Sequence, residues 1–128
     1  MNYVTDTHSL IWYFMEDERL SYKALSIFEG AMNKGLIIVP AIVLAEIIHI
    51  YQKGRINITF DETINRLETS DCFEIAPLSL EILKIADKIS KDLEMHDKLI
   101  VATAIYYDIP LTTKDEHITK TKVVNVIW

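Results

Sequence analysis

Four acidic residues lie far apart along the chain, each beside a segment of apolar residues. They are Asp6, Glu46, Asp97 and Asp115. Carboxylate oxygens, with no cysteine or paired histidine among them, favour a hard cation such as Mg²⁺ or Mn²⁺ over zinc. One or two such ions can activate a water molecule and bind phosphoryl oxygens. If the four side chains meet in the folded protein, they predict metal-dependent phosphate chemistry.

The stretch between Asp97 and Asp115 predicts how two of these acids meet. Residues 99–107 carry almost no charge and indicate a buried helix, Pro110 stops it, and residues 111–113 indicate a short strand. In a right-handed β-α-β connection a helix starts at the carboxyl edge of the sheet, and the next strand ends at that edge. We therefore expect Asp97, as the opening residue of the helix, and Asp115 to lie at the edge where open α/β sheets bind ligands.

The other two acids follow earlier strands. Asp6 closes a strand over residues 2–5, and Glu46 interrupts an apolar helix over residues 41–53 that follows a strand over residues 36–39. The same handedness argument assigns both to the same edge. Glu46 stands about a turn and a half into its helix, so its side chain has to reach back toward the sheet.

Each acid taken alone has a structural explanation. Asp97 could cap its helix, and Asp6 and Asp115 could be turn residues. Glu46 has apolar neighbours, where a carboxylate is rarely buried without a partner, although it could face solvent. Four such positions at one edge are less expected by chance than any one of them.

Hydroxyl and basic side chains adjoin the acids. The threonines could hold a metal-bound water or a phosphate, or simply reflect strand propensity and helix capping. The basic side chains could contact or steer a polyanion, or be ordinary solvated groups. The threonines are Thr5, Thr7 and Thr113, and the basic residues are His8, His96, Lys98 and Lys114.

Strands alternating with helices predict an α/β fold, a three-layer α/β/α sandwich with a mainly parallel central sheet. We expect one domain over residues 1–128. Leu80, Leu83, Ile85, Ala86 and Ile89 are the candidates for the buried side of the helix at 79–93. The remaining elements are helices at 21–33, 60–69 and 79–93, strands at 73–75 and 123–127, and a polar turn at 116–122.

Composition limits the classes of function. The chain has 128 residues and a net charge of −6, which argues against a nucleic-acid binder that relies on a broad basic face. Cys72 is the only cysteine, so no disulfide can form within the chain, and a reducing compartment fits. No secretion signal and no apolar run long enough for a membrane span is visible, so we expect a cytoplasmic protein with no membrane partner.

The local contexts of the acids resemble those of the PIN-domain ribonucleases, nearest to the VapC-like toxins of type II toxin–antitoxin pairs. The matching segments are VTDTH at Asp6, LAEI at Glu46, HDKLIVATA at Asp97 and TTKDEHI at Asp115. This resemblance implies an RNA substrate, Mg²⁺- or Mn²⁺-dependent cleavage, a cognate antitoxin and frequent homodimerisation. It also implies that the four acids bind the metal, with Thr113 as a supporting hydroxyl. Lys98 departs from the family, in which many members carry an arginine after the third acid.

Other functions compete with this prediction. A housekeeping RNA-processing PIN nuclease would share the site, and a non-catalytic interaction domain would share only the fold. A phosphatase resembling the haloacid dehalogenases would need an acid two residues after Asp6, where this chain has His8. A receiver domain would need an acidic pair before its phosphorylated aspartate and a lysine after its last strand, which this chain lacks.

Overall fold

A five-stranded parallel sheet in the order β3-β2-β1-β4-β5 forms the centre of the protein. The computed structural model describes residues 1–128. In register, Val4 of the central strand pairs with Ile38 on one side and Leu111 on the other. The strands are β1 (Asn2–Thr5), β2 (Leu36–Pro40), β3 (Phe73–Ala76), β4 (Leu111–Thr112) and β5 (Val126–Ile127).

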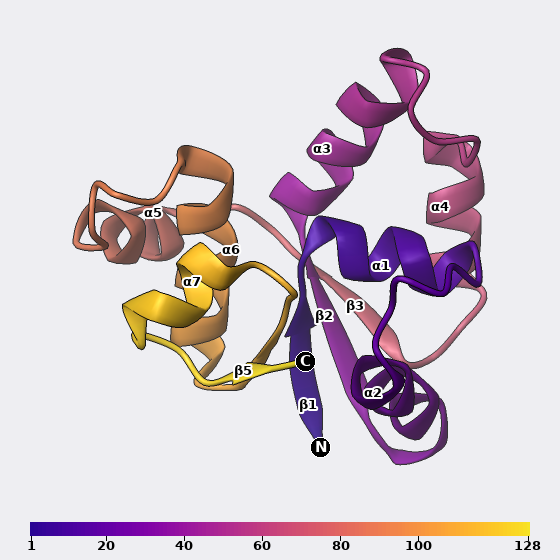
Figure 1. The fold of residues 1–128 in the computed structure, drawn as a ribbon, viewed down its shortest axis with the longest axis horizontal. Helices are drawn as coiled ribbons and strands as arrows, with labels where there is room; N and C mark the ends of the chain where they lie inside the picture. Colours follow the sequence, from indigo (N-terminus) through magenta and orange to yellow (C-terminus); the bar gives the residue numbers. More distant parts are fainter.

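Helices cover both faces of this sheet (Figure 1). The chain passes from β1 through β2 to β3 in one direction and returns through β4 and β5 on the other side of β1. Crossovers between parallel strands are right-handed as a rule, so reversing the direction along the sheet moves the helices to the opposite face. The first face carries α1 (Thr7–Phe14), α2 (Tyr22–Lys34), α3 (Ala41–Gln52) and α4 (Phe60–Glu68). The second carries α5 (Leu80–Asp87), α6 (Met95–Tyr107) and α7 (Glu116–Thr121). The three-layer α/β/α architecture is the one the sequence predicts.

The core fills the space between the layers. Ile37, Ile38 and Val39 are all buried, because a parallel strand covered on both faces hides both of its rows of side chains. The middle of α6 is buried over residues 99–104, which agrees with its lack of charge. None of the helices combines the length and the apolar character that crossing a bilayer requires.

The predicted helix at 79–93 is shorter than expected. It ends at Asp87, where the N–H groups of Lys88 and Ile89 bond to carbonyls three residues back and tighten the last turn. Leu80 and Leu83 are 61% and 43% exposed, so their expected burial was wrong, although Ala86 and Ile89 are buried as expected.

Two boundaries near the acidic residues also differ. The helix expected to open at Asp97 begins at Met95, which puts Asp97 inside its first turn. The expected polar turn at 116–122 contains the short helix α7, because Asp115 caps it and Ile118 anchors it in the core. The last strand is confined to Val126–Ile127.

Candidate active site

The site lies where β1 and β4 end side by side in the middle of the sheet. Thr5 pairs with Thr112, and the chain then leaves the two strands toward opposite faces, into α1 and α7 (Figure 1). This reversal of strand order opens a crevice at the carboxyl edge of the sheet. Asp6 follows β1 directly, and Asp115 follows β4 after a short loop.

Thr113 joins these two acidic residues. Its hydroxyl donates a hydrogen bond to Oδ2 of Asp6 and accepts one from the backbone N–H of Asp115, at 3.1 Å. Oδ1 of Asp6 caps α1 by accepting from the N–H of Ser9, at 2.9 Å. Burial raises the pKa of Asp6 above its ordinary value, while the hydrogen bonds from Ser9 and Thr113 act in the opposite direction.

Glu46 reaches the same region from α3. Its Oε1 accepts a hydrogen bond from the hydroxyl of Thr7, which is the first residue of α1. The side chain is half-buried. The bond fixes the Glu46 carboxylate of α3 beside the first residue of α1.

Asp97 carries the clearest electrostatic perturbation. Its pKa is raised to about 6, first by burial and then by the negative charges of neighbouring carboxylates. Those carboxylates belong to Asp115, Glu94, Glu46 and Asp6, in decreasing order of effect. Carboxylates that follow three different strands, β1, β2 and β4, therefore act on the charge of Asp97.

Asp115 has two roles in the local structure. Its Oδ1 accepts a hydrogen bond from the N–H of Ile118, at 3.0 Å, and so caps α7. The residue is half-buried, and it lines the same cleft as the other three predicted acids. Asp115, considered above as a possible turn residue, is therefore the N-cap of a short helix.

The cleft has a volume of about 740 Å³ and is strongly acidic. Its walls hold seven carboxylates and one lysine. Sequence reasoning missed four of the titratable lining residues. They lie in a loop, on α7 or just before α6, where the sequence has no apolar pattern that would show which way a side chain points. The lining residues are Asp6, Thr7, His8, Trp12, Glu46, Asp92, Leu93, Glu94, Asp97, Ile100, Lys114, Asp115, Glu116 and His117; the missed ones are Asp92, Glu94, Glu116 and His117.

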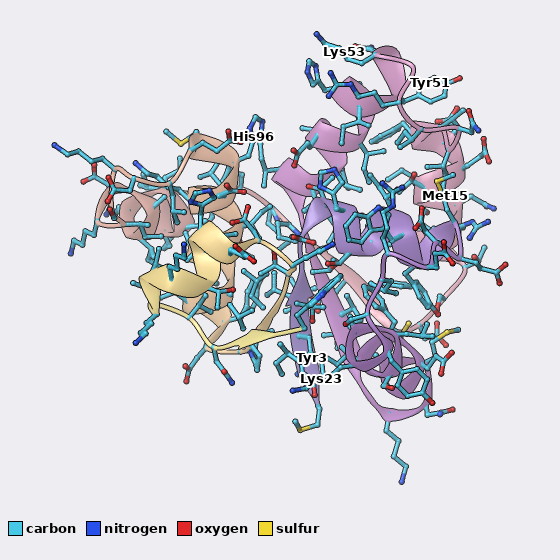
Figure 2. All side chains as sticks on the ribbon, in the orientation of Figure 1. Tyr3, Met15, Lys23, Tyr51, Lys53 and His96 are labelled. Carbon is cyan, nitrogen blue, oxygen red and sulfur yellow. The ribbon has the colours of Figure 1, made fainter.

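Other predicted neighbours lie elsewhere. His96 is at the start of α6 (Figure 2). It does not line the cleft, and its Nδ1 is 3.4 Å from Oε1 of Glu94. Lys98 does not line the cleft. The Thr5 hydroxyl donates to the backbone carbonyl of Asp6, at 2.9 Å, which gives it a structural role.

The donor set fits a hard divalent cation in its chemistry. The four predicted acids and Thr7 supply carboxylate and hydroxyl oxygens, two imidazoles, His8 and His117, also line the cleft, and no thiol does. In this structure no three His, Cys, Asp or Glu side chains lie close enough together to hold a metal ion. Burial is the main cause of the raised pKa of Asp97, and repulsion by the neighbouring carboxylates, with Asp115 first among them, adds to it.

Comparisons with known proteins agree with this architecture. The structure resembles VapBC2 of Rickettsia felis bound to a promoter DNA fragment, with a TM-score of 0.73, 16% identity, and coverage of 99% of this chain and 98% of that one. It also resembles a toxin–antitoxin complex of Klebsiella pneumoniae, with a TM-score of 0.68, 19% identity and coverage of 98% and 95%. VapC20 of Mycobacterium tuberculosis, a toxin that cleaves the sarcin–ricin loop, gives a TM-score of 0.66, 12% identity and coverage of 98% of both chains.

At these identities the likeness to solved structures establishes the fold. No curated protein matched the chain. The family model described as "PIN domain" matches residues 3–124, which is nearly the whole chain. The protein belongs to the PIN domain family.

Proposed function

We propose that this chain is a Mg²⁺- or Mn²⁺-dependent endoribonuclease that acts as the toxin of a toxin–antitoxin pair. The observation that carries the proposal is the position of Asp6, Glu46, Asp97 and Asp115 around one cleft at the carboxyl edge of a PIN fold. Four carboxylates from separate elements are unfavourable together unless a cation compensates them.

The four carboxylates would hold the metal, and the chain's hydroxyl groups orient two of them. Thr113 fixes Asp6 relative to the backbone of Asp115, and Thr7 fixes Glu46. When bound, the ion supplies activation of a water and stabilisation of charge on the phosphate. Asp97 must be ionised to contribute, so its raised pKa makes metal binding favour neutral over acidic solution.

The direct test is cleavage of a labelled RNA in Mn²⁺ and in EDTA. Asp97→Asn keeps the shape of the side chain but removes the charge, and we expect at least a hundredfold loss of activity. Glu81→Gln, an exposed position in the first turn of α5, is the matched control and keeps full activity. Equal, metal-independent activity in both variants would contradict the proposal, and no cleavage by the parent chain would favour a non-catalytic interaction domain.

The toxin role concerns a partner protein. The neighbours that are toxin–antitoxin complexes support an antitoxin as this chain's partner. A second groove of about 1000 Å³ beside α1 and α4 is lined in part by the aromatic residues Trp12, Tyr13, Phe14 and Phe73. The lining also holds five carboxylates and one arginine, so the groove suits a segment with apolar and basic side chains.

Growth of a bacterial host separates the toxin from a housekeeping nuclease. Induction of the parent chain should arrest growth, Asp97→Asn should not, and co-expression of the product of the adjacent reading frame should restore it. RNA cleavage in vitro without growth arrest would favour the RNA-processing alternative.

Homodimerisation stays a prediction from the family resemblance. Four exposed apolar side chains, on the outer strand β3, on α5 and in the connection between them, offer a surface for a second copy. Leu80→Glu with Leu83→Glu should lower the sedimentation coefficient to that of a monomer, whereas Lys84→Glu on the same helix should not. The apolar residues are Ile75, Leu78, Leu80 and Leu83.

A further inference from the structure

Lys114 is the only lysine or arginine that lines the acidic cleft. It lies between Thr113 and Asp115, and its side chain is exposed. A strand of RNA that enters the cleft meets carboxylates on nearly every side, in a protein whose net charge is −6. Apart from bound metal ions, the ammonium group of Lys114 is the only permanent positive charge there that can attract a phosphate.

The ammonium of Lys114 is not neutralised by the carboxylates around it. The ion pairs within 4 Å in this structure are Arg19–Asp17 and His96–Glu94. Nζ of Lys114 instead lies 5.8 Å from the centroid of the Trp12 ring, within the range of a cation–π interaction. A lysine held on an aromatic face remains free to bind an anion.

Trp12 is a fixed support for this lysine. The residue is only 9% exposed, and its ring packs edge-on against Trp128, with centroids 5.9 Å apart. The guanidinium carbon of Arg19 is also near the ring, at 5.1 Å. Arg19 makes two side-chain hydrogen bonds to Asp17, of 3.0 and 2.7 Å, so its charge is already paired. Lys114 is therefore the available cation at this ring.

We propose that Lys114 binds a backbone phosphate of single-stranded RNA at the rim of the cleft, and that Trp12 is a positioning residue that holds the ammonium away from the carboxylates. The inference rests on the proposed ribonuclease function and deepens it. A lysine is a point charge without fixed bidentate geometry, so this contact orients the strand without reading its sequence.

Binding measured in EDTA tests the contact without cleavage. The probe is a fluorescein-labelled 12-nucleotide single-stranded RNA of mixed sequence, and anisotropy is recorded from 50 to 200 mM KCl. We expect Lys114→Gln to raise Kd about tenfold at 50 mM KCl and to flatten the plot of log K against log salt by about 0.7, the value for one lost phosphate contact. Lys114→Arg should restore both quantities. Lys120→Gln, an exposed lysine of α7 outside the cleft lining, should change neither.

Trp12 is tested through the same salt slope, which a loss of stability alone does not change. Trp12→Leu should flatten the slope as Lys114→Gln does, and Trp12→Phe, which keeps an aromatic face, should retain it. Thermal unfolding identifies any variant that fails to fold, in which case Trp12→Phe and the Lys114 variants decide the question.

Steady-state cleavage in Mn²⁺ supplies the independent readout. Lys114→Gln should raise KM with kcat within about threefold of the parent. Unchanged Kd, salt slope and KM in Lys114→Gln, with full cleavage by the parent chain, would overturn the inference and leave the proposed function intact. Absence of cleavage by the parent chain would overturn the proposed function, and the binding arm would still show whether Lys114 contacts RNA.

Discussion

At the scale of single residues, the Asp97 carboxyl makes protein stability depend on pH. Its pKa of about 6 in the folded protein lies above the ordinary value of 3.8, so the folded state binds this proton more tightly than the unfolded state does. Its stabilising contribution is complete below pH 4 and is lost as the pH rises through 6. The shift corresponds to at most about 3 kcal/mol, and partial exposure to water reduces this to about 1 kcal/mol.

We therefore expect Asp97→Asn, in EDTA, to unfold at a higher temperature than the parent chain at pH 7.5. The advantage should disappear near pH 4, where the parent carboxyl is protonated. Thermal unfolding at half-unit steps of pH measures the difference between the two proteins, which cancels the titration of groups that do not interact with Asp97. A difference that grows toward low pH would contradict the assigned direction.

The Thr113 hydroxyl allows a second prediction at this scale. Thr113→Val preserves the shape of a fully buried side chain but removes the partner of Asp6 Oδ2 and of the Asp115 N–H. Leaving such groups unpaired costs about 1–3 kcal/mol of unfolding free energy. We expect that loss in urea unfolding, with a tenfold or larger fall in RNA cleavage. Thr113→Ser keeps the hydroxyl and should keep most of both.

At the scale of elements, Gly35 is where α2 passes into β2. A Cβ added there would lie 2.4 Å from the carbonyl oxygen of Met1 and 3.0 Å from Cα of Ala31. Because that carbonyl accepts a hydrogen bond from Leu36, Gly35→Ala has to disturb the first pairing of β1 with β2. We expect a loss of about 1–3 kcal/mol in urea unfolding.

Gly30 provides the matched control for this change. It lies within α2, and a Cβ there would meet no atom within 4 Å. Gly30→Ala should raise the unfolding free energy by about 0.5–1 kcal/mol, since glycine is a poor helix former. Equal effects of the two substitutions would show that the close approach at Gly35 is unimportant.

Elements also explain what the sequence could and could not predict. The handedness of β-α-β connections places Asp6 and Asp115 at one edge without any knowledge of side-chain contacts. The six residues of α7 hold one buried side chain, Ile118, which is too few to produce a helical pattern. The sequence therefore offered no indication that Glu116 and His117 would line the cleft. Leu80 and Leu83 were misassigned because apolar spacing identifies a face but not whether another layer covers it.

At the scale of the whole molecule, acidic groups from both helical layers converge on the central strand β1. Asp6 and Glu46 belong to the side of α1 and α3, while Asp97 and Asp115 belong to the side of α6 and α7. Like charges that meet across the sheet oppose the approach of the two halves of the molecule. A cation that binds all four carboxylates stabilises the complete fold, because the unfolded chain cannot bring the four carboxylates together.

This linkage predicts that Mg²⁺ raises the melting temperature of the whole protein. For a dissociation constant of about 1 mM, 10 mM Mg²⁺ contributes about 1.4 kcal/mol, or a rise of about 4–6 °C for a chain of this size. Scanning calorimetry compares the melting temperature in MgCl₂ with that in NaCl of equal ionic strength. NaCl screens charges without occupying the site. Asp97→Asn with Asp115→Asn should lose the Mg²⁺-specific rise while Glu81→Gln keeps it. An equal rise in NaCl, or in the double variant, would mean that Mg²⁺ only screens the surface, and the four carboxylates would then need another role.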